Sequence, residues 1–313
     1  DKLTGHITYF YFLNNRLENL KSAATKTRAK LSTKVQALGQ SKTPAQHAEM
    51  VAAAKHEIIE GNTFQVQIGL SENYQVEGDW LDIYGSLRQI NPSPHMFYLK
   101  FTQEGKAYRL LGASPELLYR QRQGEMESFP LAGTTRRGKT PEEDQQLVRA
   151  LLSDPKEIAE HNMLVDLHRN DLGRVARFGS VKVRRIFDIK KFSHVQHISS
   201  EVVGLIDPRE DMFSALAASF PAGTLSGAPK IESMKIIDRI ENEARGPYGG
   251  AVGHFGFNGD CTFAIPIRTI FAVDDKAFIR ASGGVVYDST AENEYAEIQN
   301  KLAATKKALA EYL

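Results

Sequence analysis

Apolar and polar residues alternate along several stretches of the chain, and this period of two predicts β-strands. The clearest alternation lies between Phe64 and Leu70. Residues 193–204 alternate in the same way, which places His194 and His197 on opposite faces of a strand, one of them inward. Weaker patterns predict further strands at 96–102, 107–112, 116–121, 180–186, 251–257, 262–271 and 278–287.

Helical spacing of the apolar residues predicts a different set of segments. Helices are expected at 44–60, 79–90, 141–152, 155–168, 210–218, 230–241 and 291–312. Residues 14–45 are polar and rich in Lys, Ala and Thr, so we expect a solvated helix and a linker there, after a strand at 6–13. The strands come in runs and do not alternate strictly with helices. This order favours a large mixed or antiparallel α+β domain over a doubly wound nucleotide-binding fold.

Composition narrows the class of protein further. The chain has 313 residues, is 42% hydrophobic and 25% charged, and carries a formal net charge of +1, which is typical of a globular protein. Near-neutral charge gives no electrostatic reason to expect nucleic acid or an anionic membrane as partner. Since no run of 18 apolar residues and no signal-peptide core occur, we expect a cytoplasmic protein. The chain begins at Asp1, which suggests that a segment precedes it.

The single cysteine rules out an internal disulfide. Cys261 lies in the apolar run CTFAIPI, where a buried and chemically inert thiol is the expected state. A glycine-rich segment, FPAGTLSGAPK, spans residues 220–230. Its two glycines permit close backbone approach to a ligand, and Thr224 and Ser226 offer short hydrogen-bonding groups. An ordinary turn before a helix is an equally good interpretation of this segment.

Two of the predicted helices carry carboxylates on one face. In the helix at 155–168, which has Asp154 as its N-cap, Glu157 and Glu160 lie on the same side. Glu157 is also placed to complete a capping box, which is a purely structural role. Glu160 shares its face with Leu164, so it points toward the packed side of the helix.

The C-terminal helix repeats this arrangement. Ser289 and Glu292 predict a capping box, after which Glu294, Glu297 and Lys301 share one face. The last two side chains suit an ordinary solvated ion pair worth about 0.3–0.5 kcal/mol. The alternative is a hard-cation site between the two helices, because magnesium needs only one or two protein carboxylates. Spacing alone does not show that the helices meet.

Ten stretches of the chain, taken together and in this order, resemble the family of chorismate-utilising enzymes, and within it the members that form anthranilate. They cover the chain from about residue 45 to its end. Each is weakly specific by itself, and ten in register are highly specific. The stretches are FQVQIGLS, INPSPHMFYLKF, GASPELLYR, PLAGTTRRG, LLSDPKEIAEHNMLVDLHRNDLGRV, SHVQHISS, FPAGTLSGAPK, RGPYGGAVGHFGF, FAIPIRTI and ENEYAEIQNKL.

The resemblance implies an overall architecture and a reaction. The expected fold is an α+β sandwich of two large, mostly antiparallel sheets with helices outside. Residues 46–313 would form the catalytic domain, and residues 1–45 would be the remnant of an N-terminal region with a linker. The expected substrate is chorismate, the expected cofactor is Mg²⁺, and a glutamine amidotransferase subunit would supply ammonia. The chain itself would aminate C2 of chorismate and eliminate pyruvate, as in the first step of tryptophan biosynthesis.

The resemblance also implies roles for individual residues. Glu116 matches the general acid that protonates the departing C4 hydroxyl, and His197 the histidine that assists pyruvate elimination. Arg268, flanked by apolar residues and so in need of an anionic partner, matches a position that binds the enolpyruvyl carboxylate. The other implied positions are Tyr248, Gly283 and Gly284 at that carboxylate; Gly133, Thr134 and Thr224 at the ring; Glu160 and Glu297 on the metal, with Glu157, Glu294 and Lys301 beside it; and Asn91, Pro92, Ser93 and Met96 at half of a tryptophan feedback pocket.

Two positions select the reaction within the family. Gln65 stands where members that add water carry a lysine base, and an amide cannot take that proton. Ala132 stands where members that form 4-amino-4-deoxychorismate carry a lysine nucleophile. Ser282 replaces a glycine near the substrate carboxylate, which leaves the fine substrate preference open. Three alternatives remain open: release of 2-amino-2-deoxyisochorismate, a 4-amino-4-deoxychorismate synthase component, and a catalytically silent chorismate-binding subunit.

Overall fold

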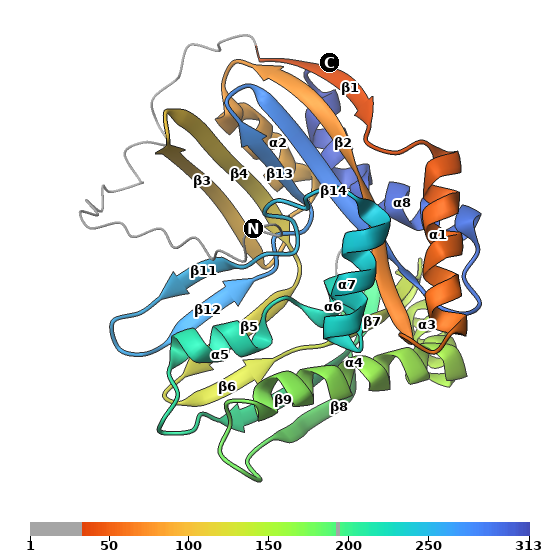
Figure 1. Cartoon of the computed structure of the whole chain (residues 1–313), viewed down its shortest axis with the longest axis vertical. Helices are drawn as coiled ribbons and strands as arrows, with labels where there is room; N and C mark the ends of the chain where they lie inside the picture. The colour runs from red at the N-terminus through yellow and green to blue at the C-terminus, as the bar shows by residue number, and fades with distance from the viewer. Residues whose placement is uncertain (1–32, 192–194) are drawn as a thin grey trace.

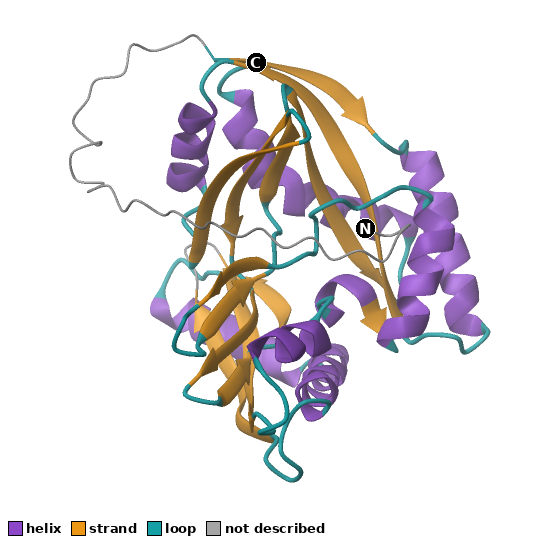
Figure 2. Cartoon of the chain, turned by 60° about the vertical axis from the view of Figure 1, so that its left-hand side comes forward, coloured by secondary structure: helices purple, strands orange, loops and turns teal. Residues whose placement is uncertain are grey.

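The computed structural model describes residues 33–191 and 195–313, which form two antiparallel β-sheets with helices packed outside them (Figures 1 and 2). The first sheet has the order β1-β2-β14-β13-β4-β3, with the short β10 paired to β2. Its strands are β1 (Lys34–Gln40), β2 (Gln65–Glu77), β14 (Lys276–Val285), β13 (Thr269–Val273), β4 (Lys106–Ser114), β3 (His95–Gln103) and β10 (Gly227–Ala228).

The second sheet has the order β11-β12-β5-β6-β9-β7, and β8 also pairs with β9. It lies in the lower half of Figure 1, below the first sheet. Its strands are β11 (Val252–Phe255), β12 (Cys261–Ala264), β5 (Leu117–Arg122), β6 (Glu125–Ser128), β9 (Val195–Leu205), β7 (Leu131–Arg136) and β8 (Lys182–Lys191). The antiparallel two-sheet architecture implied by the resemblance is therefore confirmed.

Three of the larger apolar clusters hold helices on the sheets. One joins α2 and α8 to the first sheet around Ile83 and Ile298. Another joins α1 and α7 to the start of β2 around Ile236. The largest packs α4 and α5 on the second sheet around Tyr119 and Leu172. The helices are α1 (Pro44–Ile59), α2 (Trp80–Ile90), α3 (Pro141–Ser153), α4 (Pro155–Gly173), α5 (Met212–Ser219), α6 (Gly223–Ser226), α7 (Lys230–Glu241) and α8 (Ala291–Ala310).

The structure corrects four of the local predictions. Residues 34–40 form β1 of the first sheet, where a helix and linker were expected. The predicted strand at 262–271 is two strands in different sheets, β12 and β13. The strands β6 and β7 were not predicted. The cap of α8 is Thr290, whose side chain accepts from the backbone N–H of Asn293, so the predicted Ser289–Glu292 capping box is wrong. Strand β1 precedes residue 45, where the domain boundary was proposed. That boundary stays a prediction.

Of the other expectations, some concern residues that the structure describes and some lie outside them. Cys261 is buried as predicted, and burial raises the pKa of its thiol to about 11. In the part of the chain that the structure covers, no helix is long and apolar enough to cross a membrane. The predicted strand at 6–13, the early part of the polar segment and His194 lie outside the described residues.

Candidate active site

Two connections between the sheets lie side by side at the centre of the molecule. One is the link from β4 to β5 through Pro115 and Glu116, and the other is the link from β12 to β13 through residues 265–268. The backbone N–H of Ile265 donates to the carbonyl of Glu116 over 3.1 Å. Ser114 Oγ donates to the carbonyl of Ile265 over 2.6 Å. Side chains of both connections are therefore held at one place between the sheets.

Glu116 is a buried carboxyl group in the first connection. Burial raises its pKa to about 7, against the hydrogen bond from Thr224 and the positive charges of Lys301 and Arg268. Thr224 belongs to α6, within the glycine-rich segment, and its Oγ1 donates to Glu116 Oε1 over 2.8 Å. A carboxyl group with a pKa near the working pH is well suited to general acid catalysis. The structure thus brings together two of the predicted catalytic residues.

Arg268 supplies positive charge from the second connection. Its backbone is left-handed, with φ of 49°, which is uncommon for a residue with a large side chain. Burial lowers the pKa of its guanidinium group, and the charge of Glu116 acts in the opposite direction. Arginine remains charged in proteins. Since Glu116 holds its proton up to about pH 7, a substrate carboxylate would be the stronger partner for Arg268 near neutral pH.

His197 lies opposite Thr134 in the pairing of β9 with β7. Its Nδ1 is 2.9 Å from Thr134 Oγ1 and 3.3 Å from the carbonyl oxygen of Gly133. Because a carbonyl oxygen only accepts, the contact with Gly133 is a hydrogen bond in the tautomer that has its proton on Nδ1, and this tautomer has its lone pair on Nε2. Burial lowers the pKa of His197, the Gly133 carbonyl opposes this, and the charge of Arg268 lowers it further. The neutral imidazole can therefore act as a base.

Carboxylates from α4 and α8 influence one another electrostatically. The pKa of Glu157 is raised first by burial and then by neighbouring negative charges, including those of Glu160 and Glu297. Burial also raises the pKa of Glu294, against a hydrogen bond from Ser289 and with a further rise from Glu297. Glu157 and Glu160 belong to α4, and the other two glutamates belong to α8. The negative charge of Glu297 in α8 therefore acts on Glu157 in α4, so the two helices place these carboxylates within electrostatic range of each other.

The chemistry of this carboxylate cluster fits a hard cation. Glu294 Oε2 is buried and has no hydrogen-bond partner among the described residues. A divalent cation would relieve the mutual repulsion that raises the pKa of Glu157. Over residues 33–191 and 195–313, no three His, Cys, Asp or Glu side chains are grouped tightly enough to hold a metal ion by themselves. Magnesium commonly takes one or two protein carboxylates and completes its shell with water or substrate oxygens.

Gln65 and Lys301 connect this cluster to the first sheet. Gln65 Nε2, at the start of β2, donates to Glu160 Oε1 over 3.1 Å. Lys301 Nζ lies 2.6 Å from Glu297 Oε1, which is the predicted ion pair. The same ammonium donates to the carbonyl of Ser282 in β14 over 2.8 Å. Both side chains of the pair are partly exposed, as in a solvated ion pair, and Lys301 in addition joins α8 to the first sheet.

The glycines of β14 leave room for side chains of the cluster. A Cβ at Gly283 would lie 2.5 Å from Glu294 Oε2, and one at Gly284 would lie 2.8 Å from Gln65 Nε2. Tyr248 is buried, with its hydroxyl 2.9 Å from Ser282 Oγ. Ala132 is buried against α4 in a small apolar cluster with Leu164 and Leu167.

Replacing Gly283 with alanine should displace Glu294 and destabilise the protein by about 1–3 kcal/mol, as overpacking does. Urea denaturation checks this. Gly85→Ala is the matched control, because a Cβ at this position in α2 meets nothing within 4 Å. That control should stabilise the protein by about 0.5–1 kcal/mol, since alanine favours helix. An unchanged denaturation midpoint for Gly283→Ala would refute the predicted crowding.

Lys230 is a neighbour of the site whose contacts could not be predicted from the sequence. It begins α7, as expected, but its Nζ lies 2.7 Å from Asp171 Oδ1 at the far end of α4. The same Nζ donates to the carbonyl of Ser219 over 3.4 Å. The two ends of the glycine-rich segment are thus tied together and to α4, which places Thr224 beside Glu116. No local pattern signals a contact between residues 59 positions apart in sequence.

The four residues of the predicted tryptophan pocket gather at the connection from α2 to β3. Asn91 ends α2 with its N–H on the carbonyl of Leu87, and Ser93 Oγ donates to the carbonyl of Asn91 over 3.2 Å. Pro92 is exposed, and Met96 pairs with Ala113 of β4. Their role in feedback stays a prediction.

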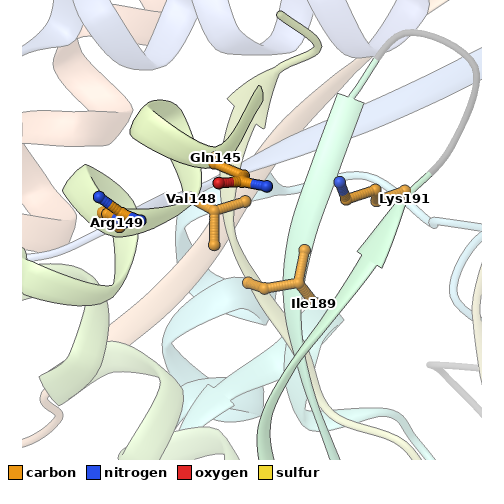
Figure 3. Close-up of a pocket in the computed structure, with 5 residues that line it drawn as sticks. All are labelled: Gln145, Val148, Arg149, Ile189 and Lys191. Atoms are coloured by element: carbon orange, nitrogen blue, oxygen red, sulfur yellow. The ribbon is translucent and has the colours of Figure 1, made fainter. Parts of the chain in front are cut away.

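A surface hollow of about 280 Å³ lies apart from these residues, between α3 and β8. Figure 3 shows its lining of Gln145, Val148, Arg149, Ile189 and Lys191. None of the predicted site residues lines it. Of the predicted catalytic residues, Glu116 is buried, His197 and Thr224 are half-buried, and Lys301 is exposed.

Comparison with known proteins identifies the family. Residues 12–307 match the family described as chorismate binding enzyme. Anthranilate synthase component 1 of Leptospira biflexa is 59% identical over 99% of this chain and 67% of its own length. The solved anthranilate synthase component I of Streptococcus pneumoniae is 38% identical with a TM-score of 0.79, over 88% of this chain and 60% of its own. The menaquinone-specific isochorismate synthase of Escherichia coli shares the fold at 20% identity, with a TM-score of 0.77, over 89% and 64%.

The chain belongs to the family of chorismate binding enzymes. Many of its curated relatives are named anthranilate synthase component 1, and it spans about two thirds or less of the length of these relatives. The family resemblance found in the sequence is thereby confirmed. Since an isochorismate synthase has the same fold, the fold alone does not choose between ammonia and water as the nucleophile.

Proposed function

We propose that this chain catalyses the amination of chorismate at C2 with ammonia, followed by loss of pyruvate to give anthranilate. The reaction balances as chorismate plus ammonia giving anthranilate, pyruvate and water. The observation that carries the proposal is the buried carboxyl group of Glu116, which accepts from Thr224 Oγ1 over 2.8 Å, has its pKa raised to about 7 and lies within electrostatic range of Arg268. A hydroxide leaving group needs a proton, and a dianionic substrate needs fixed positive charge.

Glu116, Arg268 and His197 would each have a separate role in the reaction. Glu116 would donate its proton to the departing C4 hydroxyl, while Arg268 holds the enolpyruvyl carboxylate. Afterwards the lone pair on Nε2 of His197 would take the C2 proton as pyruvate leaves and the ring becomes aromatic. This base favours complete conversion to anthranilate over release of the aminated intermediate. Retention of both groups at one site also argues against a catalytically silent subunit.

The side chain of Gln65, in the first sheet, favours ammonia over water as the nucleophile. A water molecule would need a base, and the Gln65 amide has no basic atom; its Nε2 donates to Glu160. Ala132 offers no amine for a covalent intermediate at C4. The names of the relatives support this choice.

Mg²⁺ would be held by Glu160 and Glu297, with Glu157 and Glu294 beside them, and would neutralise the ring carboxylate of chorismate. A glutamine amidotransferase partner is part of the proposal. The only cysteine of the sequence, Cys261, is buried with a pKa of about 11, so it cannot serve as the glutamine-cleaving nucleophile. The cytoplasmic location stays a prediction.

The proposal is tested by incubating the purified chain with chorismate, Mg²⁺ and an ammonium salt. We expect fluorescent anthranilate and pyruvate in equal amounts, and no product with glutamine as the nitrogen source unless a partner is added. Amination without pyruvate would favour the 2-amino-2-deoxyisochorismate alternative. Intact chorismate under these conditions would contradict an enzymatic role.

A further inference from the structure

A buried chain of three polar groups lies behind the proposed carboxylate site. Ser282, in the middle of β14, is only 1% exposed. Its Oγ lies 2.9 Å from the hydroxyl of Tyr248 and donates to Gln67 Oε1 over 3.0 Å. The Ser282 hydroxyl therefore contacts the phenol on one side and the amide on the other.

Counting protons fixes the direction of these hydrogen bonds. An amide oxygen only accepts, so the single proton of Ser282 goes to Gln67. The hydroxyl of Ser282 must then accept from Tyr248, whose phenol proton points at the serine. While this chain is intact, Tyr248 cannot donate that proton to an anion in the site.

The ring of Tyr248 is fixed, so only its hydroxyl proton can turn. The guanidinium groups of Arg245 and Arg280 lie 6.0 and 5.9 Å from the ring centroid. Both arginines are paired with the fully buried Glu241, at 2.7 and 2.9 Å. Arg245 also donates to the carbonyls of Leu225 in α6 and Gln67 in β2. The ring therefore cannot swing toward the substrate to escape Ser282.

We propose that Ser282 is a specificity-determining positioning residue that turns the proton of Tyr248 away from the substrate carboxylate. This inference rests on the proposed function, which puts that carboxylate beside Tyr248 and Arg268. With the phenol proton engaged, the carboxylate depends on Arg268. The serine thereby weakens the binding of the enolpyruvyl carboxylate by the site. Weaker binding suits a group that must leave as pyruvate.

Calorimetric titration of chorismate with Mg²⁺ and without ammonium tests the inference, since binding is then measured without turnover. The proteins are wild type, Ser282→Ala, Tyr248→Phe and the double variant. Ser282→Ala should bind chorismate about tenfold more tightly, because the freed phenol donates to a charged group. Tyr248→Phe should weaken binding about tenfold more in the Ser282→Ala background than in the wild-type background.

A second variant, Gln67→Leu, should free the Tyr248 proton without changing Ser282. It controls for any effect of Ser282→Ala on folding. Gln67→Leu removes the acceptor, so the serine proton turns to Tyr248 and frees the phenol proton. It should tighten binding in the same Tyr248-dependent way. Equal effects of Tyr248→Phe in all three backgrounds would overturn this inference alone. No binding of chorismate by the wild type would overturn the proposed function and this inference with it.

Discussion

Replacing Glu116 with glutamine should lower kcat by about 10²–10⁴-fold, which is the usual contribution of a general acid. Glutamine keeps the size of the side chain and can still accept from Thr224, but it has no acidic proton. In the native protein the carboxyl group is protonated below its pKa of about 7. Activity that depends on it should therefore fall as the pH rises through about 7, and this limb of the pH profile should be missing from the residual activity of the variant.

Thr224→Val provides a directional control for this assignment. The threonine hydroxyl lowers the pKa of Glu116 by donating to its Oε1. Its removal should raise that pKa and move the alkaline limb of the kcat profile to higher pH. A limb that stays in place in Thr224→Val, or that persists in Glu116→Gln, would assign the titration to another group.

The free energy of unfolding should also depend on pH through the proton on Glu116. The folded protein holds it up to a pH of about 7, whereas a carboxyl group in an unfolded chain releases it near about 4.3. Between these values the native state binds more protons, so the contribution of Glu116 to stability is lost as the pH rises. Glu116→Gln should flatten this part of the stability profile.

Replacing either Glu160 or Glu297 with glutamine should raise the Mg²⁺ concentration needed for half-maximal activity by at least about tenfold. Each change removes one charge from the cluster in which Glu157 has its raised pKa. The repulsion also falls, which offsets the small loss of the exposed Glu297–Lys301 pair, so the variants should unfold no more easily than the wild type when Mg²⁺ is absent. Activity at several Mg²⁺ concentrations, with thermal unfolding in EDTA, measures both effects.

Glu292→Gln is the matched control, because Glu292 lies in the first turn of the same helix α8 and is exposed. It should leave the Mg²⁺ dependence as it is in the wild type. If both Glu160→Gln and Glu297→Gln keep the wild-type Mg²⁺ dependence, the carboxylate cluster does not hold the metal.

The sequence assigned roles to the residues of the site but did not place them in the fold. Glu116 and Arg268 were identified by resemblance, yet a period of two does not tell to which sheet a strand belongs. The apolar run at 262–271 therefore looked continuous, although it leaves one sheet and enters the other at Arg268. The left-handed backbone of this arginine has no signal in the residue type.

Contacts between residues far apart in the chain could not be predicted from the sequence either. Helical spacing placed Glu157 and Glu297 each on a helix face but did not relate the two faces, whereas in the structure the charge of Glu297 acts on Glu157. Overlapping local motifs can mislead as well. Ser289 and Thr290 are both good caps, and tertiary contacts decide between them: Ser289 instead donates to the buried Glu294, which leaves Thr290 to cap α8.

The choice of nucleophile is the central claim, and one isotope experiment tests it most directly. The purified chain is given chorismate and Mg²⁺ in ¹⁸O-labelled water containing ¹⁵N-labelled ammonium, and the products are weighed by mass spectrometry. We predict anthranilate that carries ¹⁵N and no ¹⁸O at C2, formed with an equal amount of pyruvate. A product carrying ¹⁸O and no ¹⁵N at C2 would show that this site adds water and would contradict the account.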